Sequence, residues 1–68
     1  MKIEYDREAD ALYVTFRAVA VDHSNEIEDG VVVDFDKENR IVGVEVLDAS
    51  HRLTREELAK AEFVGLTG

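Results

Sequence analysis

The chain has 68 residues, which is enough for a single domain over residues 1–68. It carries 16 acidic against 8 basic residues, and the resulting net charge of −8 repels phosphate backbones and argues against autonomous nucleic-acid binding. It has no cysteine for disulfides or thiolate zinc sites, and no apolar run approaches the ~20 residues that cross a bilayer.

A domain of this size buries a limited core, so we expect self-association to supply the missing stability. Met1 leads directly into strand-like sequence, with no basic segment followed by an apolar one, which predicts a complete cytoplasmic protein. The negative charge favours solubility and would also suit a basic partner. We therefore expect a homo-oligomer, with a basic protein as a candidate partner, and no binding to nucleic acid or membrane.

Two strands open the chain, at residues 2–5 and 11–17, where β-branched and aromatic residues are frequent. A hairpin that pairs Tyr5 with Leu12 and places Ile3 opposite Val14 leaves residues 6–11 as the loop. The apolar residues that this register places on one face are Ile3, Tyr5, Leu12, Val14 and Phe16.

The polar loop and the segment after the second strand are less regular. In the loop, the carboxylates of Asp6 and Asp10 are expected to accept hydrogen bonds from nearby backbone amides. Residues 18–21 either extend the second strand or pass over the sheet edge, and the sequence leaves the path of residues 18–28 open. Residues 22–25 are typical of a turn, and a short strand is expected at 26–28.

A valine-rich hairpin follows, with strands at residues 31–36 and 41–47. A two-residue turn at Glu38 and Asn39 lets the two apolar rows share a face, and Asn39 tolerates the positive φ that this turn requires. The expected pairs are Phe35 with Val42, Val33 with Val44, and Val31 with Val46.

The last element is a helix of ~10 residues, too short to be stable alone. Thr54 and Glu57 form a capping box, Leu53 and Leu58 occupy the two staple positions, and Gly65 is the expected stop. Its apolar side would contain Leu58, Ala61 and either Phe63 or Val64.

Together these elements predict an α+β fold, in which an antiparallel sheet of four to five strands, a meander of hairpins, precedes one C-terminal helix. The helix would cover only part of the valine-rich face, and the uncovered area would suit a dimer.

Two blocks of this sequence resemble the YuzE-like family, small prokaryotic domains of unknown function. The first is Tyr5-Asp6 with Glu8-Ala9-Asp10-Ala11-Leu12-Tyr13-Val14; the second is Asp29-Gly30-Val31-Val32-Val33-Asp34-Phe35-Asp36 with Ile41-Val42-Gly43-Val44-Glu45-Val46-Leu47-Asp48-Ala49. Asn39 stands where that family often has glycine. Its members are often encoded beside small putative toxins, so the resemblance implies an antitoxin-like role, and it supplies no catalytic residues.

The acids of residues 34–45 match the spacing of an EF-hand calcium loop at positions one, three, five and twelve. Asn39 stands at position six, where the sharp turn usually requires glycine. An EF-hand also needs a helix on each side, whereas both flanks here are typical of strands. The pattern therefore predicts a hairpin turn.

Three further groups of residues invite a chemical interpretation. Asp48, Ser50 and His51 have the side chains of a catalytic triad, but they lie within four residues on one loop, with no nucleophile elbow. His23 and His51 match no metal-ligand spacing. The acids of the first loop, Asp6, Glu8 and Asp10, could form an acid–base pair but are typical of an exposed turn. We predict no catalytic, cofactor-binding or metal-binding residues.

Two functions of different kinds stay open. The first is a small acidic protein-interaction module, antitoxin-like by resemblance, that acts as a homo-oligomer. The alternative is a carboxylate- or metal-dependent hydrolase with a site at a subunit interface, built from Asp34, Asp36, Glu45 or Asp48 together with His51. The lack of a convergent catalytic set favours a protein that is not an enzyme.

Overall fold

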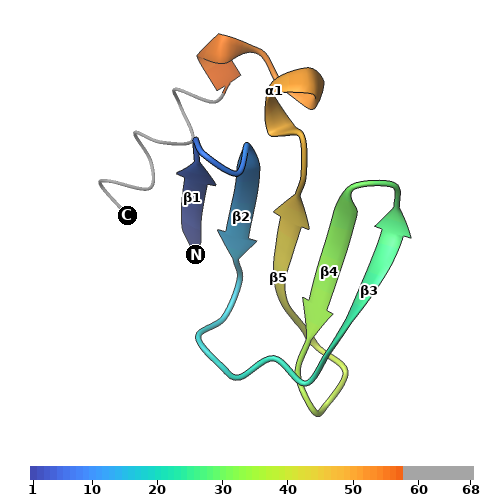
Figure 1. The fold of residues 1–68 in the computed structure, drawn as a ribbon. Helices are drawn as coiled ribbons and strands as arrows, with labels where there is room; N and C mark the ends of the chain where they lie inside the picture. The colour runs from blue at the N-terminus through green and yellow to red at the C-terminus, as the bar shows by residue number, and fades with distance from the viewer. Residues whose placement is uncertain (58–68) are drawn as a thin grey trace.

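A computed structural model describes residues 1–57 of the chain. It contains one five-stranded antiparallel sheet and a short helix, α1 (Figure 1). The elements are β1 (Lys2–Asp6), β2 (Ala11–Thr15), β3 (His23–Glu28), β4 (Val31–Phe35), β5 (Ile41–Val46) and α1 (Ala49–Arg52). The predicted α+β fold class is confirmed.

The strands follow the order β1-β2-β5-β4-β3, so the sheet departs from a continuous meander where β2 pairs with β5 instead of β3. The connecting segment crosses the end of β5 and β4 (Figure 1). The amides of Phe16 and Arg17 donate to the Val42 carbonyl of β5 at 2.7 and 3.2 Å. The Asp22 amide donates to the Phe35 carbonyl of β4 at 2.8 Å. The chain therefore crosses the end of the sheet, and β3 begins at residue 23 rather than at residue 26.

The register of the first hairpin is confirmed, with Tyr5 opposite Leu12 and Ile3 opposite Val14. β2 also pairs with β5, and there Leu12 stands opposite Val46. Side chains of directly opposite residues lie on the same face of a sheet. The apolar rows of the two hairpins therefore form one continuous face.

The valine-rich hairpin has the predicted pairs Val31–Val46 and Val33–Val44, but the expected pair of Phe35 with Val42 is wrong. Phe35 stands opposite Ile41, so Val42 is an extra residue in β5, a β-bulge.

The β4–β5 turn is longer than the predicted two residues, which accounts for the bulge. The amide of Asp36 donates to the carbonyl of Arg40 at 2.9 Å. The Asp36 carboxylate also accepts the amides of Glu38 and Arg40, both at 2.9 Å, and so organises the turn from within. Asn39 has the expected positive φ, 65°.

α1 packs on the continuous apolar face, which we call the covered face. Ala49 of α1 is fully buried against Leu12 of β2. The apolar residues around this contact are Ile3, Tyr5, Val46 and Leu53. Among the described residues, the other buried apolar side chains are Val33 and Val42. The opposite side of the sheet, which we call the open face, lacks such a cover within residues 1–57.

The sequence did not predict α1, and one of its side chains ties it to the β3–β4 turn. The Arg52 guanidinium donates to the Asp29 carbonyl and, at 3.2 Å, to the Glu28 carboxylate. Gly30 has a φ of 83°, and a Cβ there would lie 2.8 Å from the Arg52 Nη2 atom. Glycine at this position therefore serves both the turn and the arginine contact.

The predicted capping box is confirmed at the start of a second helical segment, residues 55–57. The Thr54 amide donates to the Glu57 carboxylate at 2.9 Å, and the Glu57 amide donates to the Thr54 hydroxyl at 3.2 Å. The remaining residues assigned to this helix, Leu58, Ala61, Phe63, Val64 and Gly65, lie outside the described residues. Within residues 1–57, no helix is long and apolar enough to span a membrane.

The two faces predict losses of stability of different size for the same substitution at neighbouring positions. Val33→Asp places a charge on the covered face, where Val33 is 6% exposed, and should lower the free energy of unfolding by about 3 kcal/mol or more. Val32→Asp, on the open face, should cost about 1 kcal/mol, mainly through lost β-propensity and cross-strand repulsion. Urea denaturation measures both, and equal costs would contradict the assignment of faces.

Candidate functional site

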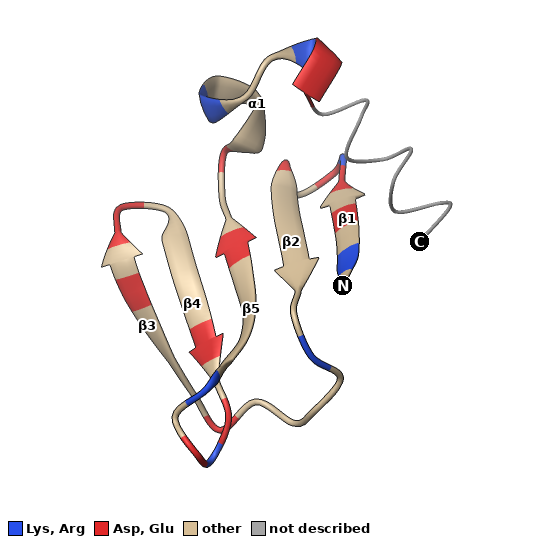
Figure 2. Ribbon diagram, turned by 180° about the vertical axis from the view of Figure 1, so that it is seen from behind, with Lys and Arg blue, Asp and Glu red and all other residues tan. Residues whose placement is uncertain are grey.

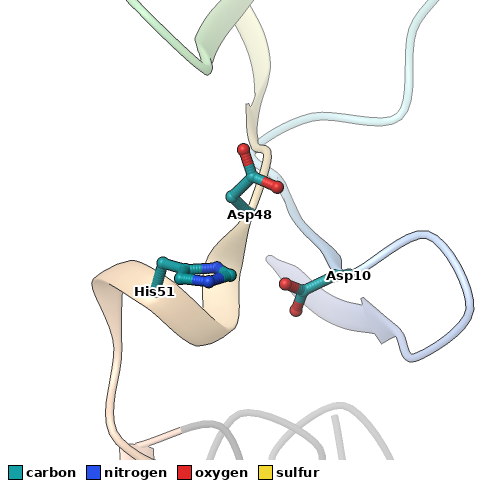
Figure 3. Close-up of side chains that lie close together, drawn as sticks. All are labelled: Asp10, Asp48 and His51. Atoms are coloured by element: carbon teal, nitrogen blue, oxygen red, sulfur yellow. The ribbon is translucent and has the colours of Figure 1, made fainter.

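The β1–β2 turn meets the junction between β5 and α1, and three metal-ligating side chains gather there. Asp10 comes from the turn, Asp48 immediately precedes α1, and His51 lies within it (Figure 3). One ligand atom from each residue lies within 4.8 Å of the other two. No other group of this kind occurs among the described residues.

Asp10 is held in place by donors from both sides of this junction. Its carboxylate accepts the Tyr5 hydroxyl at 2.6 Å, the Ser50 amide at 3.0 Å and the Ser50 hydroxyl at 2.6 Å. Its carbonyl accepts the Ala49 amide at 2.9 Å. Asp10 therefore links the first hairpin to α1.

The prediction that both loop aspartates bond to amides of their own turn is thus wrong for Asp10, which the tertiary contact recruits. It is right for Asp6, whose carboxylate accepts the amides of Glu8 at 3.0 Å and Ala9 at 3.2 Å.

The donors around Asp10 favour its ionised form. The hydroxyl of Ser50 makes the largest contribution to lowering the pKa of the Asp10 carboxyl, followed by the hydroxyl of Tyr5. Hydrogen bonds to a carboxylate stabilise the charge and make the group a stronger acid. Asp10 is therefore an oriented carboxylate at neutral pH.

Asp48 and His51 are exposed, and their side chains make no hydrogen bond or ion pair with any residue of the described part of the chain. Asp48 has a φ of 52° and does not cap α1 with its side chain. Ser50 donates its hydroxyl to Asp10 rather than to His51, so the Asp48–Ser50–His51 arrangement lacks the hydroxyl–imidazole pairing of a triad.

His23 lies apart from this group, near the β4–β5 turn. Its ring stacks on Phe35 with centroids 5.2 Å apart, and its nitrogens lie 2.9 Å from Asp22 and 3.0 Å from Asn39. The hydrogen bond to Asp22 is the main cause that raises the pKa of His23. The two histidines therefore belong to different surroundings.

A second feature is the open face, where acids lie on four of the five strands. Figure 2 shows acidic positions on β1, β3, β4 and β5. The registers place one residue of each strand in a row across the sheet. In the order of the strands, this row is Glu4, Tyr13, Glu45, Val32 and Glu26. We call it the acidic row.

Tyr13 lies flat on this face because β5 has a glycine beside it. A Cβ on Gly43 would lie 2.5 Å from the Tyr13 hydroxyl oxygen. That hydroxyl donates to Asp34 at 2.6 Å, and Ser24 donates to the same carboxylate at 2.5 Å. The bond to Asp34, followed by burial, raises the pKa of Tyr13 to about 12.

The acids with EF-hand spacing are divided between two places, and the predicted hairpin is confirmed. Asp34 is engaged on the open face, whereas Asp36 is buried in the turn and accepts the Arg40 Nε at 3.0 Å. For the hydrolase alternative, only Asp48 and His51 come together within the described chain. Asp10, which was predicted from the sequence only as one of the acids of an exposed turn, completes that group.

Proximity of Asp10 to His51 had no local signal in the sequence. It follows from the pairing of β2 with β5, which places the β1–β2 turn beside the start of α1. An aspartate in the turn of a hairpin usually bonds to amides of that turn. Only the order of the strands shows that Asp10 bonds to Ser50 instead.

The fold and the sites define a small α+β domain with one antiparallel sheet, one covered face and one acidic face. A family model described as a protein of unknown function (DUF2283) matches residues 2–50. The chain belongs to this family. No curated protein and no solved structure matches it.

The lowered pKa of Asp10 can be tested by removing its strongest donor. Ser50→Ala should raise the pKa of the Asp10 carboxyl toward its ordinary value of 3.8, as followed by NMR of the carboxyl carbon. Because the folded-state pKa is the lower one, this carboxylate stabilises the protein above the unfolded-state pKa, and the stabilisation disappears as pH falls through the folded-state value. The variant should lose less stability on acidification. Ser24→Ala, which affects Asp34, is the control and should leave the Asp10 titration unchanged.

Proposed function

We propose that the protein is a small acidic interaction module that binds a basic protein partner across its open face and acts as a homo-oligomer. The observation that supports this most directly is the acidic row. Carboxylates stand there on β1, β5 and β3, with Tyr13 and Val32 on the strands between them.

The chemistry of this row suits lysine and arginine side chains. Their apolar stems can lie over Tyr13 and Val32, while their charged ends reach the neighbouring carboxylates. Glu4 and Glu26 are exposed and Glu45 is half-buried, so the row is accessible from solvent. The net charge of −8 adds a long-range attraction that speeds the approach of a basic partner.

Self-association is supported by apolar side chains at the opposite end of the sheet from α1. The exposed residues there are Phe16, Val19, Val21 and Ile41, with exposed fractions between 38% and 49%. Only four apolar side chains of the described part of the chain are buried. A second copy that covers the exposed residues would add the apolar burial that this small core lacks.

The antitoxin-like role is the most specific form of this proposal and rests on the resemblance to the YuzE-like family. In that role the partner is a small basic toxin, and the acidic row would neutralise part of its positive surface. The identity of the gene next to this one is the simplest observation that bears on it.

A hydrolase is the second candidate, because Asp10, Asp48 and His51 converge. It is distinguished from the interaction module by two results together. If no stoichiometric basic protein co-purifies from the native host, and if Asp48→Ala and His51→Ala abolish a measurable hydrolysis, the interaction proposal fails.

Partner binding should depend on where the acids lie and not only on how many there are. With the partner that co-purifies from the native host, the double variant Glu4→Gln, Glu45→Gln should bind about tenfold more weakly by calorimetry, since ion pairs at the protein surface contribute up to ~1 kcal/mol each. The matched control Glu8→Gln, Glu38→Gln has the same net charge but changes only turn positions. Equal weakening by both variants would contradict binding at the acidic row.

The oligomer should depend on the apolar end of the sheet. Light scattering should give the wild type at least twice the mass of one chain, and Val21→Asp should shift it toward the monomer because a charge replaces an apolar contact. Ile27→Asp is the control, since Ile27 is also an exposed aliphatic residue but lies in β3. A wild-type monomer, or dissociation by the control alone, would contradict this interface.

A further inference from the structure

We propose that Asp10, Asp48 and His51 form a binding site for one divalent transition-metal ion, with Zn²⁺ as the best fit. The site would join the β1–β2 turn to α1. It goes beyond the interaction role, because it requires neither a partner nor a reaction.

The geometry of the group is close to that of a metal site. Around a tetrahedral zinc ion with bonds of ~2.0–2.1 Å, the ligand atoms lie about 3.4 Å apart. The three ligand atoms here already lie within 4.8 Å of one another (Figure 3). Because Asp48 and His51 are exposed and have no side-chain partner in residues 1–57, small rotations can bring them to bonding distance.

The carboxylate of Asp10 is oriented by hydrogen-bond donors, as the carboxylate ligands of metal ions commonly are. Tyr5 and Ser50 both donate to its carboxylate and fix its orientation. Such outer contacts normally hold first-coordination carboxylates in place. The Tyr5 hydroxyl and the Ser50 amide donate to Oδ1, and the Ser50 hydroxyl donates to Oδ2, so one lone pair on Oδ2 stays available for an ion.

The mixture of ligands selects the kind of ion. Calcium and magnesium prefer sites made only of oxygen atoms, whereas an imidazole beside two carboxylates suits zinc and neighbouring transition metals. This donor set, with an imidazole among its three members, differs from the acid clusters that are common on protein surfaces without an ion.

Binding would supply a staple that the sequence otherwise lacks. The chain has no cysteine and therefore no disulfide. An ion held by Asp10 from one side and by Asp48 and His51 from the other would close a long loop of the chain, and its binding free energy would add to the stability of the folded state.

The test uses the full-length protein after treatment with a chelator. Calorimetric titration with zinc chloride should show one ion per chain and a raised thermal midpoint, with weaker binding of manganese and none of calcium. His51→Ala and Asp48→Asn should each weaken zinc binding by at least about tenfold, since loss of even an outer-shell partner costs about 10–100-fold. Both positions are exposed, so circular dichroism should show that both variants fold.

His23→Ala is the matched control, because His23 also lies beside an aspartate, Asp22, but away from this group. It should bind zinc as the wild type does. NMR of the two imidazoles should show zinc-dependent shifts for His51 and not for His23. The site would be refuted if zinc did not bind, if binding persisted in His51→Ala, or if His23→Ala weakened binding as much as His51→Ala.

Discussion

The pairing of β2 with β5 is the contact on which the rest of this structure depends. Each hairpin alone has local signals and local contacts, but a two-stranded ribbon is at best marginally stable in water. The β2–β5 ladder joins them into five strands and places Leu12 beside Val46. It also brings the Asp10 turn under α1. The buried Ala49–Leu12 contact and the Asp10–Ser50 bonds both follow from this one ladder.

The same ladder gives the sheet two chemically different faces. On the covered face, apolar residues of successive strands stand opposite one another, and α1 closes over one end of them. On the open face, carboxylates alternate with apolar or small residues. Gly43 is the position that makes this face flat, because Tyr13 can lie across it and reach Asp34 on the far side. The stability of the domain is associated with one face and its candidate recognition surface with the other.

Much of the local structure could be predicted from the sequence. The alternation of apolar and polar residues predicted the strands and the register of the first hairpin. Asn39 indicated a turn position with positive φ, and Thr54 together with Glu57 indicated the start of a helix. These signals concern residues close in the chain. The departure from a continuous meander and the bulge at Val42 were not predictable in this way, because they depend on pairing between distant segments and on how the Asp36 side chain shapes a turn.

The candidate site was predictable only in part, for the same reason. Asp48 and His51 were recognised as reactive types, but their companion Asp10 is remote in sequence and has the features of a turn residue. α1 has only four residues, too few to show helical periodicity, and Arg52 links it to Glu28 and Asp29 of the β3–β4 turn, which is remote in sequence. The sequence therefore indicated which side chains have suitable chemistry but not which of them lie close together in the fold.

β3 contains a β-bulge at Ile27, because Glu26 stands opposite Val32 and Glu28 stands opposite Val31. This bulge bears on how the protein associates at high concentration. β3 is an outer strand, and all six of its residues are exposed. An unprotected outer strand can recruit further strands and start fibril growth. Here the register shifts between Glu26 and Glu28, so the outer backbone is irregular and flanked by negative charge. This border is therefore less suited to edge-to-edge pairing with another copy than a regular, uncharged outer strand would be.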